Sequence, residues 1–210
     1  MFDPKKILVL APHLDDGELG CGGSIARFCT EKREVHYAAF SSCKKSLPAG
    51  LPDDTLVKEC KLALSQLGMH ASKLLLYDFE VREFPQKRQE ILEELVSLNK
   101  YIQPDLVLIP SSTDVHQDHQ VIQQEAIRAF KKSSLLGYEL PWNQKQINTS
   151  FFISLSDADI EKKVKAIAAY QSQSHRNYTQ EDFIRSLAKV RGVQCNHAYA
   201  ESFEVYNIIA

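Results

Sequence analysis

Two short polar clusters in this chain carry side chains that could hold a metal ion. The first, within the segment 11–17, places His13, Asp15 and Asp16 directly after the apolar run 7–10. Adjacent carboxylates repel one another, so ionising both is costly unless a cation compensates them. A divalent cation bound here would remove that cost, and the segment therefore predicts a metal site.

The second cluster, His116-Gln-Asp-His119, follows another apolar run at 106–109. In an open parallel sheet, ligands bind outside the carboxyl ends of the strands. Two metal-competent clusters at two such strand ends can meet in space, which is a stronger indication than either cluster alone. Taken by itself, the second cluster is equally compatible with a polar loop that caps a helix.

Both clusters offer imidazole and carboxylate groups, and neither contains a cysteine that follows metal-site spacing. Two histidines and one carboxylate suit catalytic zinc, which keeps one position open for water. The same set suits non-haem iron(II), so Zn2+ and Fe2+ both remain open. More polar groups are present than three ligands require. A metal-activated water also needs a base and a group near the developing oxyanion, so the surplus favours metal-assisted hydrolysis.

The elements that must position these clusters alternate between strand and helix. The runs 5–11 and 105–110 are apolar without a period of two, as in parallel strands covered on both faces. Further strands are expected at 35–42, 73–77, 151–155 and 202–208, and helices at 22–32, 55–67, 85–102, 119–132, 157–170 and 179–192. An irregular loop with aromatic side chains is expected at 135–148. The pattern predicts an α/β protein with a Rossmann-like three-layer αβα fold, a mainly parallel sheet and a single domain over residues 1–210.

Composition narrows the range of partners. A net charge of -2 gives no reason to expect nucleic acid. No apolar run approaches the roughly 20 residues that span a bilayer, and the chain enters its first strand without a signal peptide. Five cysteines, an odd number without C-x-x-C spacing, indicate reduced thiols in a cytoplasmic protein. The oligomeric state stays open, and a homo-oligomer is compatible with the sequence.

The chain resembles the PIG-L/LmbE-like family of zinc-dependent deacetylases, which remove the acetyl group from N-acetylglucosamine-type amino sugars. The family pattern is roughly A-H-P-D-D-E-x-x-G-x-G-G, followed in mid-chain by H-x-D-H. Its counterparts here are Pro12 through Gly23 and His116 through His119. Similarity continues around Glu59, from Lys165 to Gln173 and around Glu201, and so covers most of the chain.

The resemblance implies a role for each matching residue. Three residues would hold the metal: His13, Asp16 and His119. Asp15 would be the general base, and His116 would stabilise the oxyanion or protonate the leaving amine. Asp118 would orient His116 and help to charge it. The proton on the amine could come from Asp15 or from His116.

Two positions depart from the family pattern. Leu14 stands in place of the usual proline, and Gly17 in place of the usual glutamate. Neither position is a ligand or the base, so the predicted metal site is retained. The glutamate normally supports the site, so its absence leaves the orientation of the ligands open. The arginine that many relatives use for substrate falls on Leu56, and Arg82 is a candidate replacement.

Four residues are predicted to contact the substrate: Arg82, Trp142, Tyr170 and Gln173. Each has a structural alternative, such as loop anchoring for the tryptophan and core packing for the tyrosine. The predicted substrate is a small or carrier-linked N-acetyl amino sugar. Segments 82–89 and 136–143 are similar to members associated with bacterial surface-polysaccharide synthesis. The alternatives are a deacylase acting on another acylated amine and a metal- or glycan-binding module without turnover.

Overall fold

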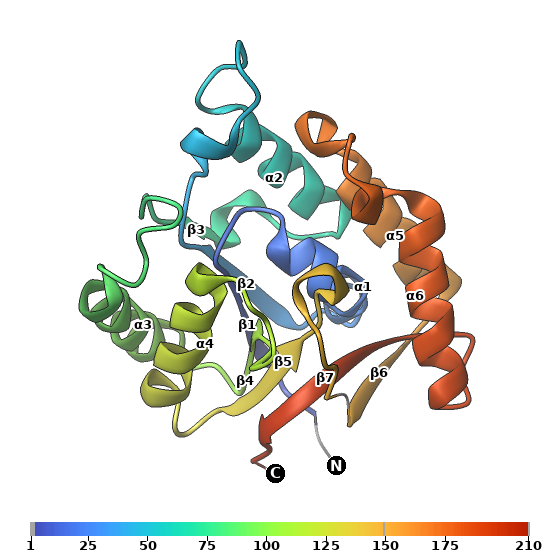
Figure 1. Ribbon diagram of the computed structural model, residues 1–210. Coiled ribbons are helices and arrows are strands. Elements are labelled where there is room, and N and C mark those ends of the chain that lie inside the picture. Colours follow the sequence, from blue (N-terminus) through green and yellow to red (C-terminus); the bar gives the residue numbers. More distant parts are fainter. Residues whose placement is uncertain (1–2, 149, 210) are drawn as a thin grey trace.

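The computed structural model describes residues 3–148 and 150–209, and within them seven strands form one sheet (Figure 1). The sheet order is β3-β2-β1-β4-β5-β7-β6. The strands from β3 to β5 in this order are parallel, and β7 is antiparallel to both β5 and β6. The strands are β1 (Lys6–Ala11), β2 (Glu34–Ala39), β3 (Leu74–Leu76), β4 (Leu106–Pro110), β5 (Ser134–Tyr138), β6 (Phe151–Leu155) and β7 (Tyr199–Asn207).

Helices cover both faces of the sheet. They are α1 (Asp16–Thr30), α2 (Thr55–Gln66), α3 (Arg88–Ile102), α4 (Gln117–Ala129), α5 (Asp157–Ala168) and α6 (Glu181–Gln194). Alternate residues of β1 enter two separate cores. Ile7 and Val9 pack with α1, α2 and α5, whereas Leu8 and Leu10 pack with α3 and α4. Because both faces are buried, β1 is apolar from Ile7 to Ala11, and the predicted three-layer fold is confirmed.

The strand order creates a crevice where the two polar clusters end. From β1 the chain proceeds through β2 to β3 on one side, and it then returns to β4 and β5 on the other side of β1. The loops that follow β1 and β4 therefore diverge, which is the topological switch point of an open α/β sheet. The two strands pair in parallel, with Ile7 opposite Leu106 and Val9 opposite Leu108, so their carboxyl ends reach the same edge.

The prediction of an irregular loop at 135–148 is wrong for its first residues, because Ser134–Tyr138 forms the fully buried strand β5. Gly137 gives this segment the appearance of a turn. Its lack of a side chain serves packing instead, since a Cβ there would lie 3.0 Å from the Tyr206 ring and 3.1 Å from the Ser111 backbone. Glycine inside a strand often marks such a close approach.

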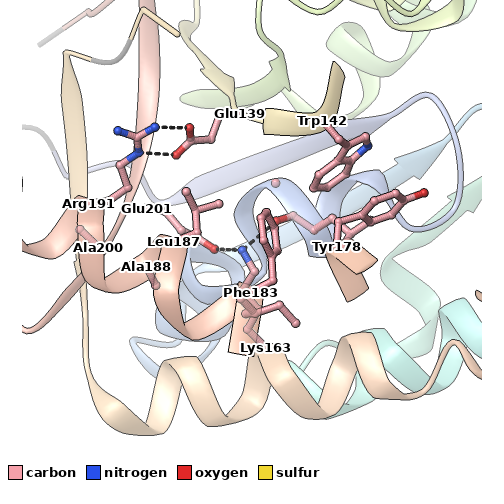
Figure 2. A pocket seen from close by; sticks show the side chains of 13 residues that line it. Glu139, Trp142, Lys163, Tyr178, Phe183, Leu187, Ala188, Arg191, Ala200 and Glu201 are labelled. Carbon is pink, nitrogen blue, oxygen red and sulfur yellow. Dashed lines mark hydrogen bonds and ion pairs between the residues drawn. The ribbon is translucent and has the colours of Figure 1, made fainter. Parts of the chain in front are cut away.

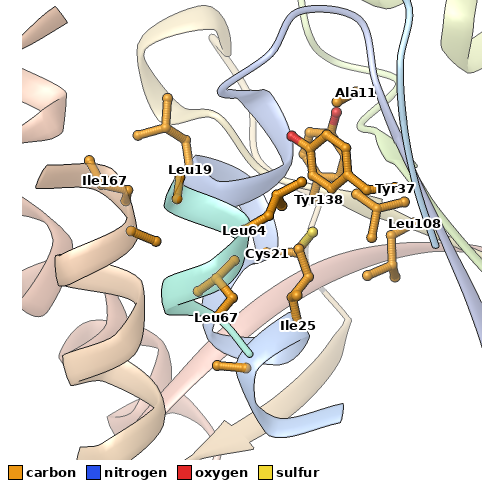
Figure 3. Packing of buried hydrophobic residues seen from close by; sticks show 14 of the residues in the cluster. Ala11, Leu19, Cys21, Ile25, Tyr37, Leu64, Leu67, Leu108, Tyr138 and Ile167 are labelled. Atoms are coloured by element: carbon orange, nitrogen blue, oxygen red, sulfur yellow. The ribbon is translucent and has the colours of Figure 1, made fainter. Parts of the chain in front are cut away.

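The first helix also begins earlier than the expected residue 22, at Asp16. It contains one non-helical residue, Cys21, with φ −144° and ψ 25°, and the glycine-rich stretch around it is helical rather than a turn. A Cβ on Gly20 would lie 2.3 Å from the Tyr138 ring, so the glycine lets α1 approach the sheet closely. Figure 3 shows Cys21 and Ile25 of this helix packed near Tyr37, Tyr138 and Leu108.

The cysteines and the helices bear on the compartment expected from the sequence. All five cysteines are free thiols. Among the described residues, no helix has both the length and the apolar character needed to cross a membrane.

Candidate active site

The predicted chemical residues meet at the switch point of the sheet. His13 and Asp15 lie in the loop after β1, and Asp16 begins α1. His116 caps α4 after the loop that follows β4, and His119 lies in the first turn of that helix. Since β1 and β4 are neighbours, two segments about a hundred positions apart in the chain form one site.

Three candidate ligand atoms form a nearly equilateral triangle. His13 Nδ1 lies 3.2 Å from Asp16 Oδ2, and His119 Nε2 lies 3.2 Å from the same oxygen. The two imidazole nitrogens are 3.1 Å apart. A tetrahedral ion with bonds of about 2.0–2.1 Å holds its ligand atoms about 3.3 Å from one another. The predicted set of His13, Asp16 and His119 therefore fits a zinc-sized ion.

In His13 and His119, the ring nitrogen that is not part of this triangle, here called the outer nitrogen, faces a carboxylate. His13 Nε2 lies 3.1 Å from Asp118 Oδ2, and His119 Nδ1 lies 2.7 Å from Asp114 Oδ2. Metal-binding histidines characteristically engage their second nitrogen in this way, which fixes the tautomer and turns the other lone pair toward the metal. Asp114 and Asp118 thus orient two imidazoles toward one point, which is a second observation in favour of a cation there.

Asp118 does not contact the residue that it was predicted to orient. Its buried carboxylate contacts His13 and accepts a hydrogen bond from the backbone N–H of Arg82 at 2.7 Å. Only the backbone N–H of Asp118 reaches His116, donating to Nδ1 at 3.2 Å in the manner of a helix cap. The predicted partner of His116 is therefore corrected, because α4 directs the carboxylate toward the loop after β1.

His116 is held as a neutral imidazole. Burial, together with the charges of His119 and His13, lowers the pKa of His116 to about 4. Since its Nδ1 accepts the Asp118 N–H, its Nε2 carries the proton and can donate. One ring nitrogen from each of His13, His116 and His119 also lies within 4.8 Å of the other two, so the three imidazoles form a group that could hold a metal ion.

The adjacent carboxylates of Asp15 and Asp16 differ in their surroundings. Burial opposes ionisation of Asp16, but the charges of His119 and His13 hold the pKa of Asp16 well below its usual range. Burial and the neighbouring Asp16 charge raise the pKa of Asp15 to about 6. Asp15 lines the cavity and forms no ion pair with another described residue. One carboxylate is thus suited to ligation and the other to proton transfer near neutral pH.

A buried polar cluster behind the site accounts for Gly17. A Cβ at this position would lie 2.5 Å from the ring of Tyr37, so no side chain fits there. Glu18, which is fully buried, contacts the Tyr37 hydroxyl and accepts a hydrogen bond from Tyr170 at 2.7 Å. Burial raises the pKa of Glu18 to about 8. A carboxyl group therefore does support the loop, one position later than the family pattern has it.

Tyr170 belongs to that supporting cluster. Its side chain is 2% exposed, and its hydroxyl also lies 2.8 Å from the carbonyl oxygen of Leu14, between His13 and Asp15 in the chain. Tyr170 does not line the cavity at the site. The structure places this residue beneath the catalytic loop, away from the wall where its predicted substrate contact would be made.

A cavity of about 300 Å³ opens beside the candidate ligands. Arg82, Trp142 and Gln173, three of the predicted substrate contacts, line it. Two further lining residues, Arg176 and Tyr178, come from the C-terminal part of the chain. The Trp142 and Tyr178 rings stack 4.0 Å apart at an interplanar angle of 9°, and Figure 2 shows them side by side.

Behind Trp142 and Tyr178, a second cavity holds only about 20 Å³ and contains paired charges (Figure 2). Lys163 Nζ lies 2.7 Å from Glu201, whose carboxylate also accepts the backbone N–H groups of Gly23 and Ser24. Glu201 therefore accepts hydrogen bonds from backbone N–H groups that have no helical partner where α1 resumes after Cys21. These groups stabilise the helix that carries Asp16 and leave no unpartnered charge for a ligand.

The fold and the site define an α/β protein with a metal-competent histidine–carboxylate centre at a sheet switch point. More narrowly, the chain belongs to the PIG-L family, because the family model described as GlcNAc-PI de-N-acetylase matches residues 8–130. This match confirms the predicted family.

Individual relatives differ in the activities that their names record. The chain is 25% identical over 223 residues to the diacetylchitobiose deacetylase of Thermococcus kodakarensis, covering 95% of this chain and 82% of that protein. A conserved protein of Thermus thermophilus has a TM-score of 0.80 at 25% identity, covering 100% of this chain and 97% of that one. The 4-carboxy-2-hydroxymuconate hydratase of Pseudomonas putida has a TM-score of 0.75 at 20% identity, with 98% of each chain covered, and shows the fold alone.

Sequence reasoning missed four residues of the site, one of which is Tyr178, whose ring lines the cavity. Asp114 stands two positions before His116, inside a segment already recognised as polar, and a search for outer partners of each histidine could have found it. Glu18 lies within the first motif, where its burial could not be known. Arg176 follows Gln173 by three positions, and only the folded chain brings it to the cavity.

Proposed function

We propose that this protein is a metal-dependent hydrolase that removes the acetyl group from an N-acetylglucosamine-type amino sugar. One observation carries the proposal: three candidate ligand atoms 3.1–3.2 Å apart share a cavity with the unpaired carboxylate of Asp15. The family match and the relative named as a diacetylchitobiose deacetylase support the substrate class. The hydratase neighbour shows that this fold also carries other chemistry, so the reaction must be assigned from the site.

Zn2+ is the metal we propose, held by His13, Asp16 and His119, and Fe2+ satisfies the same donors. When bound, the ion would polarise the acetyl carbonyl and lower the pKa of a water molecule. Asp114 and Asp118 keep the two imidazoles aimed at it.

The remaining residues divide the proton transfers. Asp15 takes a proton from the attacking water as the new carbon–oxygen bond forms. His116 donates its Nε2–H as a hydrogen bond to the carbonyl oxygen, which gains negative charge. The carbon–nitrogen bond then breaks, and Asp15 returns its proton to the leaving nitrogen, giving acetate and a free amine. His116 is less suited to this last transfer, because its pKa is lowered to about 4.

We further propose that the amino sugar is either free or linked to a carrier, as in surface-polysaccharide or glycoconjugate synthesis. The free state of all five thiols supports a reducing compartment such as the cytoplasm. A deacylase acting on another acylated amine would use the same residues, and the assay below separates it by the acid that is released.

The experiment measures acetate and primary amine released from N-acetylglucosamine and diacetylchitobiose by protein loaded with Zn2+ or with Fe2+. We expect equal amounts of the two products. Asp15→Asn should keep one metal per chain and lose about 10²–10⁴-fold in kcat, the range for a general base. Full activity of Asp15→Asn would contradict its role as the base. Sugar binding without product from the loaded wild-type protein would favour a binding module.

A further inference from the structure

The arginines of this chain fall into two groups according to their partners. Six of the eight form an ion pair with a carboxylate: Arg27, Arg33, Arg88, Arg128, Arg185 and Arg191. Arg82 and Arg176 form none with any described residue, and both line the cavity beside the candidate metal ligands. The two guanidinium groups that form no ion pair with a described residue therefore both lie at the site.

Arg176 is held in place by neutral groups. Its Nε donates to Oε1 of Gln173 at 2.7 Å, and Gln173 is only 4% exposed. Another nitrogen donates to the Tyr178 hydroxyl, and the guanidinium carbon lies 5.6 Å from the centre of that ring. Tyr178 is in turn stacked on Trp142. These partners fix the direction of the cation without forming an ion pair with it.

Arg82 is held through its backbone. Its φ of 71° is in the left-handed region, which residues other than glycine seldom adopt. The Arg82 N–H donates to Asp118 at 2.7 Å, and its carbonyl accepts from the Gln117 side chain at 2.6 Å. The same carboxylate orients His13, so the position of Arg82 is tied to the metal site while its side chain is exposed.

Two guanidinium groups that are free of ion pairs with the described residues are more than a neutral sugar requires. Sugar hydroxyls can be bound by any polar side chain, whereas the planar fork of arginine matches the oxygens of a phosphoryl or carboxyl group. The carboxylates already in the cavity do not fill this place. Asp16 pairs with the histidines, and neither Asp15 nor Asp16 forms an ion pair with either arginine.

We propose that the N-acetyl amino sugar carries an anionic phosphoryl or carboxyl group that is bound by Arg82 and Arg176. This inference rests on the proposed deacetylase function and names the substrate class more narrowly. The other role open to Arg176 is to act on Asp15, because its charge opposes the rise in the pKa of Asp15 that burial causes. If Arg176 binds an anionic group, its replacement should impair the reaction of anionic substrates only. If it acts on Asp15, its replacement should impair all substrates equally.

The test compares kcat/KM of the metal-loaded enzyme for neutral N-acetylglucosamine, its 1-phosphate, its 6-phosphate and the carboxyl-bearing N-acetylmuramic acid. We expect at least one anionic sugar to be preferred by about tenfold or more, as one charge-assisted contact provides. The three anionic substrates distinguish a phosphoryl from a carboxyl group. Arg176→Gln and Arg82→Gln should each reduce that preference by about tenfold, mainly through KM. Arg176→Lys should restore part of it, and Arg185→Gln, a surface arginine paired with Glu161 and Glu181, should change nothing.

Two results would overturn the inference. One is an anionic preference that is absent or that both glutamine variants retain. The other is a loss of kcat/KM in Arg176→Gln that is equal for neutral and anionic sugars. This would mean that Arg176 acts on the pKa of Asp15 and not on the substrate. If no sugar is hydrolysed, the proposed function fails, and calorimetry with glucosamine, its 1-phosphate, its 6-phosphate and the carboxyl-bearing muramic acid then decides this inference separately. Tighter, Arg176-dependent binding of any of the three anionic sugars supports it, and binding of all three no tighter than glucosamine overturns it.

Discussion

The two sides of the cavity are built differently. On the metal side, each imidazole of His13 and His119 is contacted at both nitrogens, and the contacting carboxylates of Asp16, Asp114 and Asp118 are buried. On the substrate side, the half-buried rings of Trp142 and Tyr178 stack on one another and come from short 3-10 segments rather than from strand ends. The metal side is thus fixed by charge within the fold, and the substrate side by stacking and neutral hydrogen bonds.

This difference predicts how substitutions on each side should behave. Changes on the metal side should alter metal content, its pH dependence and kcat, because they disturb a constellation that must converge within tenths of an ångström. Changes on the substrate side should alter KM and substrate preference.

Asp16→Asn should have the largest effect. The substitution removes the charge that both candidate ligand histidines face at 3.2 Å. We expect metal affinity to fall by about a thousandfold or more, which corresponds to about 4 kcal/mol. Metal content after dialysis and acetate release should fall together. A variant that keeps a full complement of metal would favour ligation by His13, His116 and His119 instead.

Metal binding should depend steeply on pH. Burial alone would lower the pKa of His13, but the Asp16 charge and contacts with Asp118 raise it to about 9. Burial likewise opposes a rise at His119, whose pKa the charges of Asp16 and Asp114 bring to about 10. We therefore expect both imidazoles to be protonated at pH 7 in the metal-free protein, so that each releases a proton when metal binds.

The apparent affinity should accordingly rise by about a hundredfold per pH unit between pH 7 and 8.5, the slope for two released protons. Titration with Zn2+ in two buffers of different ionisation enthalpy would measure the proton count directly. Release of no proton would show that the two histidines are neutral before the metal binds.

The outer carboxylates should have smaller effects. Asp114→Asn and Asp118→Asn each weaken a partner of one ligand histidine, which typically costs about 10–100-fold in metal affinity or activity. Asp114 should matter more, because its contact is 2.7 Å against 3.1 Å for Asp118. Competition with a chelator would rank the two variants. A larger loss in Asp118→Asn would reverse the order and give greater weight to its second contact, with the backbone of Arg82.

The sequence predicted the metal side far better than the substrate side, for a physical reason. His13 to Asp16 and His116 to His119 are contiguous groups at the ends of apolar strands, so chain order alone brings them together once the sheet is parallel. The substrate wall depends on where Gln173 and Arg176, which follow α5, come to lie beside the metal ligands, and no spacing in the sequence indicates this. Strand β5 was also expected to be part of an irregular loop.

The sequence also did not reveal which neighbours individual side chains contact. Asp118 and Tyr170 were recognised as residues of interest but placed against the wrong neighbours. Helix α4 turns the carboxylate of Asp118 toward His13, and burial turns the hydroxyl of Tyr170 toward Glu18 and Leu14. Spacing in a sequence defines which residues share an element, but the direction of each side chain follows from packing.

Gly17→Ala should destabilise the protein without removing any ligand. The new methyl group would lie 2.5 Å from the Tyr37 ring, and overpacking of this kind costs about 1–3 kcal/mol in the free energy of unfolding. Gly22→Ala is a matched control in the same helix, where the nearest atom, at 3.2 Å, belongs to the longer side chain of Lys163. Denaturant unfolding of both variants would compare them. Equal stability would indicate that the Tyr37 ring moves freely.

Trp142→Ala should produce the smallest effect and the clearest contrast with the metal side. The substitution removes a ring stacked 4.0 Å from Tyr178, and such pairs contribute about 0.5–1.5 kcal/mol beyond the area they bury. We therefore expect KM to rise by about two- to tenfold. Metal content and kcat should stay near those of the wild type, because the ring contacts of Trp142 are with Tyr178 and Phe183. Trp142→Phe, which keeps a ring, should recover part of the loss. A fall in kcat as large as that of the outer-carboxylate variants would mean that the two sides of the cavity are coupled, and the division between them would fail.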